Sequence, residues 1–333
     1  MLFSMSLLAV GLMATSVIAH FETKRTIADT QRRAQLSKRC APAVAASNEK
    51  RYAKRILQRK QAFEKRGNVT YTITTEAPYY NVIPNNQSCV FDPDAIEGPY
   101  YWPRADMLRQ DITEDQDGIP LWLDIGVIDI ATCKPVENAL VDVWHANATG
   151  SYSSFSRYSP DLTIEEMIAS LNLTYNYTMG ITDIHTDDET FLRGLWPTDS
   201  DGIIEMKTIL PGWYSGRSIH IHAMAHLDWV LTKNGTILES RKISRGQFYI
   251  NETFTQQYLK EYPYTKHMEK ENVTRTTNDV DRIYSDAMVP GNDPDIQFDY
   301  VNGIDFADGV IGYTTIGVDT IRYDIQAPLN PPL

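Results

Sequence analysis

Short stretches of alternating apolar and polar residues recur between residue 69 and residue 319. Alternation with a period of two is typical of β-strands that bury one face, because successive side chains point to opposite sides of a strand. Asp-Gly and Pro-Gly dipeptides between these stretches are turn signals. The pattern therefore predicts strands over residues 69–77, 121–130, 138–146, 201–209, 218–226, 247–250 and 309–319.

Many short strands separated by turns indicate an all-β protein, and we expect an antiparallel β-sandwich over residues 71–325. Residues 160–180 have a helical pattern, so we expect them to form a short helical insertion between strands. Residues 326–333 are rich in proline, and we expect them to form an extended tail.

Residues 20–70 differ from the rest of the chain in charge. Residues 20–66 hold 14 lysines and arginines against four acidic residues, a net charge of +10, whereas the whole chain carries −12. The acidic total argues against nucleic acid as a partner. The segment has helical character but little apolar content, and it contains Lys-Arg pairs that include 24–25, 38–39, 54–55 and 65–66. We interpret it as a basic, partly helical extension, and it fits an arm, a cleaved pro-segment or a solvated helix packed on the domain.

Residues 1–19 form an apolar run that ends in Val17-Ile18-Ala19, which predicts a secretory signal peptide. A buried helix and a membrane anchor are the alternatives, but the run is short, and no other stretch is apolar enough to span a membrane. Eight N-x-Ser/Thr sequons also favour a secreted glycoprotein. They begin at Asn68, Asn86, Asn147, Asn172, Asn176, Asn234, Asn251 and Asn272.

Three cysteines fit an oxidising compartment and one disulfide. We predict a bond between Cys89 and Cys133, because both lie in or near the strands of the predicted domain. Cys40 lies in the basic extension and is left over by this pairing. Three unpaired thiols are the alternative, which secretion disfavours.

The stretch PGWYSGRSIHIH, residues 211–222, carries the strongest candidate chemistry. His220 and His222 are two positions apart in a predicted strand, so both imidazoles leave the same face and can reach one metal ion. Tyr214 lies just upstream, where its phenolate can approach the same point. Phenolate and imidazole together suit Fe(III) better than calcium or magnesium. The alternative is a pair of surface or hydrogen-bonded core histidines.

Five motifs place this stretch in a wider pattern. They are EGPYYWP (97–103), VDVWHANATGSYSSF (141–155), FLRGLWPTDSDG (191–202), PGWYSGRSIHIH (211–222) and GQFY (246–249). In this order they resemble the intradiol ring-cleavage dioxygenases, and the chain looks like the secreted fungal branch of that family. The resemblance spans roughly residues 75–320. It implies an antiparallel β-sandwich with a mononuclear non-haem Fe(III) site.

The resemblance also assigns roles to individual residues. The family's iron ligands are two tyrosines and two histidines, which fall on Tyr152, Tyr214, His220 and His222. Its active-site arginine and glutamine fall on Arg217 and Gln247, and Arg217 is also expected to contact the substrate. Tyr100 and Tyr101 of EGPYYWP either line the substrate pocket or pack a turn.

The implied activity is insertion of both atoms of O₂ into a catecholic or polyphenolic ring, with intradiol cleavage to a cis,cis-muconate-type product outside the cell. The alternative is a non-catalytic secreted β-sandwich that binds carbohydrate or cell wall, and retention of all four ligands favours the enzyme. Only five residues separate Tyr214 from His220, which predicts a shallow, open pocket. A glycan on Asn147 would crowd the site, so we expect it to be absent or directed outward. Whether the protein forms homo-oligomers stays open.

Overall fold

The computed structural model describes residues 27–66, 89–90, 97–102, 104–105, 107–179, 182–233, 235–288 and 292–321. The predicted signal peptide (1–19), the strand predicted for 69–77 and the predicted tail (326–333) lie outside these ranges. Among the helices within them, none is both long and apolar enough to cross a membrane.

The elements of the described chain are mostly strands. The helices are α1 (Ile27–Arg66), α2 (Ile164–Ser170), α3 (Glu252–Tyr258), α4 (Arg282–Ala287) and a 3-10 turn, η2 (Tyr264–Lys266). The strands are β1 (Cys89–Val90), β2 (Pro120–Asp129), β3 (Lys134–Pro135), β4 (Leu140–Trp144), β5 (Arg193–Pro197), β6 (Ile203–Ile209), β7 (His220–Leu231), β8 (Ile237–Tyr249), β9 (Gln297–Tyr300) and β10 (Val310–Val318). Each alternating segment predicted within the described residues is a strand or the end of one.

The strands form two sheets in the described residues. The first has the order β1-β10-β2-β3, with β6 also pairing with β2 and β9 with β10. The second has the order β5-β4-β7-β8 and is antiparallel throughout. The all-β sandwich predicted from the sequence is therefore confirmed. The first sheet adds a parallel part, because the long connection from β2 to β10 is a crossover that brings β10 parallel to β2.

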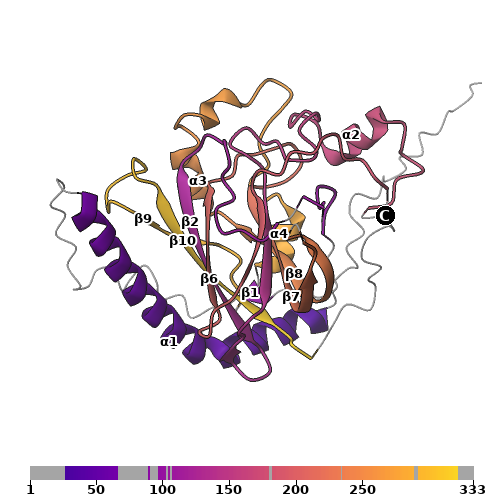
Figure 1. Cartoon of the computed structure of the whole chain (residues 1–333). Helices are drawn as coiled ribbons and strands as arrows, with labels where there is room; N and C mark the ends of the chain where they lie inside the picture. Colours follow the sequence, from indigo (N-terminus) through magenta and orange to yellow (C-terminus); the bar gives the residue numbers. More distant parts are fainter. Residues whose placement is uncertain are drawn as a thin grey trace, which may run out of the picture.

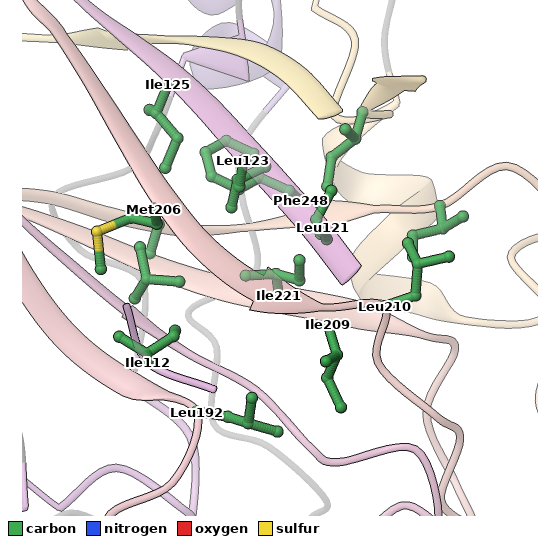
Figure 2. Close-up of a cluster of buried hydrophobic side chains, with 14 of the residues drawn as sticks. Ile112, Leu121, Leu123, Ile125, Leu192, Met206, Ile209, Leu210, Ile221 and Phe248 are labelled. Atoms are coloured by element: carbon green, nitrogen blue, oxygen red, sulfur yellow. The ribbon is translucent and has the colours of Figure 1, made fainter. Parts of the chain in front are cut away.

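The main core lies between the two sheets (Figure 2). Leu121, Leu123 and Ile125 occupy every second position of β2 and are fully buried. Ile221 of β7 and Phe248 of β8 belong to the same apolar cluster. Because side chains alternate along a strand, the intervening residues of β2 point to the outer face of the sheet.

Helix α1 packs on that outer face and runs along one side of the molecule (Figure 1). Its buried side chains recur every three or four residues, so they share one face of the helix. They are Arg33, Ser37, Cys40, Val44, Asn48 and Arg51. Most of this face is polar, which is why the apolar content of the segment gave no sign that it would be buried.

Arg51 joins α1 to the first sheet through a buried ion pair. Its Nη1 lies 3.2 Å from Oδ1 of Asp124, and both side chains are inaccessible to solvent. The guanidinium also donates to the carbonyl oxygen of Thr314 at 3.0 Å and to Oγ1 of Thr315 at 3.1 Å. A Cβ atom on Gly126 would lie 2.5 Å from Nη1 of Arg51, so glycine at this position leaves room for the guanidinium.

A disulfide bond also joins α1 to the first sheet. It links Cys40 to Cys133, with 5.1 Å between the two Cα atoms, so the predicted Cys89–Cys133 bond was wrong. Cys89 belongs to β1, and β10 and β2 separate β1 from the β2–β3 turn that holds Cys133. Two strand spacings amount to roughly 10 Å, beyond the roughly 7 Å Cα separation that a disulfide can bridge.

Candidate active site

The two candidate histidines lie at the start of β7, and they share one face of it. Ile221 and Ala223 point into the core between the sheets, whereas His220, His222 and Met224 point to the opposite face. The Nε2 atoms of the two imidazoles are 3.0 Å apart, and both side chains are buried. The predicted strand alternation therefore brings the two nitrogens to one point.

Hydrogen bonding and burial act on the two imidazoles. Nδ1 of His220 lies 2.6 Å from the carbonyl oxygen of Ser218, which can only accept, so Nδ1 carries a proton and the neutral tautomer has its lone pair on Nε2. The ring of His222 stacks on Trp144, with 4.7 Å between centroids. Burial, followed by the nearby His220 and Arg217, lowers the pKa of His222 well below its usual range. Neutral imidazoles are the form that binds metal ions.

Tyr152 and Tyr214 come from two loops that touch backbone to backbone. A Cβ atom on Gly150 would lie 2.1 Å from the carbonyl oxygen of Trp213, and one on Gly212 would lie 2.2 Å from that of Ala148. Gly150 also has a φ of +86°, which favours glycine. The two glycines thus allow the loop after β4 and the loop before β7 to meet, which places the tyrosines together.

Asn147 organises both loops. Its Oδ1 accepts hydrogen bonds from the backbone N–H groups of Thr149 and Ser151, each at 3.0 Å, and its carbonyl oxygen accepts from Gly212 at 2.9 Å. Its Nδ2 donates to Oε1 of Gln116 at 3.0 Å. A glycan on this sequon would be attached to the same nitrogen and would replace one of its two hydrogens.

The phenol groups of the two tyrosines are buried beside the histidines. The Tyr152 and Tyr214 ring centroids are 5.7 Å apart, and Oη of Tyr214 lies 3.5 Å from Nε2 of His220. Burial, more than any other cause, raises the pKa of Tyr214 to about 12 and raises that of Tyr152 well above its ordinary value. Oη of Tyr152 is buried and makes no hydrogen bond of standard geometry within the described chain. A cation would satisfy this oxygen.

The donor atoms at this point are two phenol oxygens and two imidazole nitrogens. In the part of the chain that the structure describes, no group of three or more His, Cys, Asp or Glu side chains is arranged to hold a metal ion. Tyrosine is therefore needed to complete a metal centre here. Hard phenolate oxygens with imidazole nitrogens fit a ferric ion.

Arg217 lies beside this group of four, in the short turn between Tyr214 and His220. Its Nη2 donates to Oε1 of Gln247 at 2.6 Å and to Oη of Tyr249 at 3.3 Å. Its Nε donates to Oδ2 of Asp281 at 2.8 Å. Burial lowers the pKa of Arg217, but Tyr249 and Asp281 raise it by more, so the guanidinium stays charged. The structure therefore joins the predicted pair, Arg217 and Gln247, and adds Tyr249 and Asp281.

Comparisons with known proteins show what this chain is similar to. A family model described as Dioxygenase matches residues 96–178. Catechol 1,2-dioxygenase of Pseudomonas sp. (strain EST1001) is 37% identical over 87 residues, which are 25% of this chain and 28% of that protein. Catechol 1,2-dioxygenase 1 of Acinetobacter lwoffii is 31% identical over 126 residues, 37% of this chain and 32% of that protein. The matches thus span less than a third of each curated relative's length.

A solved structure extends the comparison over more of the chain. The intradiol ring-cleavage dioxygenase from Tetranychus urticae superposes with a TM-score of 0.54 at 23% identity, covering 72% of this chain and 97% of that one. At 23% identity, the match shows that the two proteins share a fold. The chain therefore carries a Dioxygenase match over residues 96–178 and has the fold of an intradiol ring-cleavage dioxygenase.

Tyr100 and Tyr101 occupy different environments. Tyr100 stacks on Tyr152, with 4.7 Å between ring centroids, and meets Tyr214 edge-on at 5.9 Å. Tyr101 instead packs against Trp144 at 4.9 Å. Tyr100 therefore contacts two of the candidate ligands, and Tyr101 packs behind them.

Arg193, in the FLRGLWP motif, joins two segments of the site, although sequence reasoning assigned it no role. Its Nε donates to Oγ of Ser153 and its Nη2 to the carbonyl oxygen of Ser153, each at 2.8 Å. Nη2 also donates to the carbonyl oxygen of Tyr100 at 2.7 Å. The buried guanidinium thus ties the turn that carries Tyr100 to the loop that carries Tyr152.

The helical insertion between β4 and β5 packs against the tyrosine side of the site. Thr163 begins α2 in a capping box, because its side chain accepts from the N–H of Glu166 and its own N–H donates to the Glu166 carboxylate at 2.8 Å. Met167 and Ile168 of α2 are buried in the apolar cluster that contains Tyr152. The predicted insertion is confirmed, and it covers part of the site.

Proposed function

We propose that this protein is an Fe(III)-dependent dioxygenase that inserts both atoms of O₂ into a catecholic ring and cleaves it between the two hydroxyl-bearing carbons. The product is a cis,cis-muconate-type dicarboxylate. The observation that carries the proposal is the convergence of two buried phenols and two buried imidazoles, with a charged arginine beside them. The Dioxygenase match over residues 96–178 and the similarity to catechol 1,2-dioxygenase support the same reaction class.

Tyr152, Tyr214, His220 and His222 would hold the ferric ion. Their donor set is hard and can supply two negative charges, which offsets most of the charge of the ion. The raised pKa of both phenols means that metal binding would displace their protons, so affinity should rise with pH. Bound Fe(III) would supply the Lewis acid that holds both catechol oxygens and makes the ring reactive toward O₂.

The neighbouring side chains would handle protons and charge. A Tyr214 phenolate is a strong base, because burial raises the pKa of this group to about 12, so Oη can accept a proton from the catechol. Arg217 stays charged and would stabilise the negative charge that develops on the substrate. Oε1 of Gln247 is fixed by Arg217 and Tyr249, which leaves its amide N–H groups as donors to the substrate.

The test combines spectroscopy with turnover. The purified protein loaded with Fe(III) should show a visible tyrosinate-to-iron charge-transfer band. It should consume one O₂ for each catechol and give the ring-opened dicarboxylate. Oxygen uptake across catechol, hydroxyquinol, protocatechuate and larger phenols would then define the substrate and test the predicted open pocket. A protein that stays colourless after iron loading would overturn the proposal and leave the binding-protein alternative.

Tyrosine variants make the ligand assignment specific. Tyr214→Phe should lose most turnover and shift the visible band, because it removes one candidate ligand and proton acceptor. Tyr175→Phe is the matched control, since Tyr175 is almost fully exposed in the helical insertion. Equal spectra and rates for the two variants would show that Tyr214 is not a ligand.

We also propose that the protein is secreted and glycosylated. The Cys40–Cys133 disulfide and the eight sequons support this. Of the described sequons, Asn172, Asn176 and Asn272 are exposed, whereas Asn251 caps α3 by accepting from Phe254 at 2.9 Å. Glycopeptide mass spectrometry of protein from a eukaryotic secretory host should find glycans at the exposed group. Unmodified protein retained inside the cells would contradict the proposal.

A further inference from the structure

Asp281 is a buried carboxylate that the proposed reaction leaves without a role. It precedes α4, lies 64 residues after Arg217 in the chain and is only 4% exposed. One of its oxygens, Oδ2, faces the active-site turn, where Nε of Arg217 donates to it at 2.8 Å. The backbone N–H of Ser218 donates to the same oxygen at 2.9 Å, and Oγ of Ser218 at 3.1 Å.

The other oxygen of Asp281 is fixed by the helix. Oδ1 accepts hydrogen bonds from the backbone N–H groups of Ile283 at 2.8 Å and Tyr284 at 3.2 Å, so Asp281 is the N-cap of α4. Because each oxygen has its own set of donors, the carboxylate cannot rotate without losing several bonds at once. Asp281 is thus a rigid anchor between α4 and the active-site turn.

Two functional side chains depend on this anchor. With its Nε held by Asp281, the guanidinium of Arg217 directs Nη2 to Gln247 and Tyr249. Ser218, whose N–H and hydroxyl are held by Asp281, presents its carbonyl oxygen to Nδ1 of His220 at 2.6 Å. That bond keeps the proton on Nδ1 and the lone pair on Nε2, which is the nitrogen that faces His222.

We propose that Asp281 is a positioning residue of the active site, which holds Arg217 toward the substrate and His220 in its metal-binding tautomer. This inference rests on the proposed function. Burial raises the pKa of Asp281, but the charge of Arg217 and the Ser218 hydrogen bond outweigh it and lower this pKa to about 2. The anchor is therefore ionised at any pH at which the enzyme is expected to work.

Asp281→Asn tests the proposal while keeping α4 intact. Asparagine is as good an N-cap as aspartate, but it cannot offer a negative oxygen to Arg217 and Ser218 at once. We expect kcat/KM for catechol to fall about 10- to 100-fold, together with weaker iron binding, as for other groups that orient metal ligands. Asp279→Asn, at an exposed position two residues upstream, is the matched control and should behave as wild type.

A double-mutant cycle separates positioning from a general loss of structure. If Asp281 acts through Arg217, then Asp281→Asn should cost much less kcat/KM in an Arg217→Met background than in the wild type. A purely structural role would give the same loss in both backgrounds, and this result would overturn the proposal. Asp281→Ser keeps the cap as well, so it carries the test should the asparagine variant fail to fold.

The contact can also be followed without iron or turnover. In the metal-free protein, the NMR signal of the Arg217 Nε–H should be protected from exchange in wild type and Asp279→Asn, and should lose that protection in Asp281→Asn. Wild-type protein that binds no iron and consumes no oxygen would refute the proposed function, whatever this signal does. Active wild type with an equally active Asp281→Asn variant would refute only the positioning role.

Discussion

Two buried arginine–aspartate pairs lie on the two sheets of this protein and serve different ends. On the first sheet, Arg51 of α1 pairs with Asp124 of β2 and also donates hydrogen bonds to Asn48, Thr314 and Thr315. Beside the second sheet, Arg217 pairs with Asp281 and also donates hydrogen bonds to Gln247 and Tyr249, beside the candidate metal ligands. The first pair holds a helix against a sheet, and the second fixes the orientation of Arg217, a candidate catalytic residue.

The difference shows that a buried ion pair does not by itself reveal a functional site. Each pair is desolvated, and each must be hydrogen-bonded to be tolerated in the interior. Arg217 differs because it lies beside groups that can bind metal and substrate. Besides its pairing with Asp124, Arg51 donates to backbone, amide and hydroxyl oxygens. Stability measurements and rate measurements should therefore separate the two pairs.

The largest expected effect on folding is at Arg51. Arg51→Met leaves Asp124 buried without its cation, and we expect the free energy of unfolding to fall by about 3–5 kcal/mol. Chemical denaturation of the metal-free protein measures this. Lys54→Met is the matched control on the same helix, because its ion pair with Asp199 is about half exposed. Lys54→Met should lower the free energy of unfolding by less than about 1 kcal/mol. Similar losses in the two variants would contradict the structural role assigned to the buried pair.

At Arg217 the main effect should be on the rate. Arg217→Met should lower kcat/KM for catechol by about 10²- to 10³-fold, as expected when a preorganised charge near the reacting atoms is removed. Arg217→Lys should recover only part of this, because an ammonium cannot reach Asp281 and Gln247 together. Folded Arg51→Met protein should keep wild-type kcat/KM. A rate loss at Arg51 as large as at Arg217 would erase the distinction between the pairs.

The disulfide sharpens the structural side of the comparison. Cys40→Ser should reduce the free energy of unfolding by about 2–4 kcal/mol, since the bond closes a long loop. Cys133→Ser should cause the same loss, and the double variant should lose no more than either single one. Wild type kept in reductant should match them. Additive losses would mean that the two sulfurs do not form one bond.

The smallest expected effect is the acid sensitivity of the second pair. The pKa of Asp281 is lowered to about 2 in the folded protein, against 3.8 for a free side chain. Burial raises this pKa, and the charge of Arg217 contributes most to lowering it. The ionised carboxylate therefore adds about 2 kcal/mol to the free energy of unfolding above about pH 4. This stabilisation is lost as the pH falls through about 2. Acid titration of metal-free Asp281→Asn should lack this component, and Asp279→Asn should keep it.

Local patterns in the sequence were enough to predict the strands and the grouping of the four candidate metal ligands. A period of two placed His220 and His222 on one face of β7, and the motif order placed Tyr152 and Tyr214 with them. These predictions needed only neighbours in the chain or motifs of known order. Ligation of iron by the four residues stays a prediction.

Contacts between distant segments could not be predicted in the same way. The pairing of Cys133 depends on the strand order of the first sheet, and the burial of α1 depends on a mostly polar helix face. Asp281 lies outside every motif, and only the folded chain brings it to Arg217. Arg193 was inside a recognised motif, but its role follows from three hydrogen bonds rather than from its neighbours in the sequence.

The bond between Cys40 and Cys133 also decides what a protease acting on the basic extension would release. A cut after Arg39 would free everything before it, because that fragment lies upstream of Cys40. A cut after Arg55 would free nothing, since the upstream piece would stay attached through sulfur and separate only under reducing conditions. In an oxidising environment the extension can thus be nicked and still remain part of the molecule.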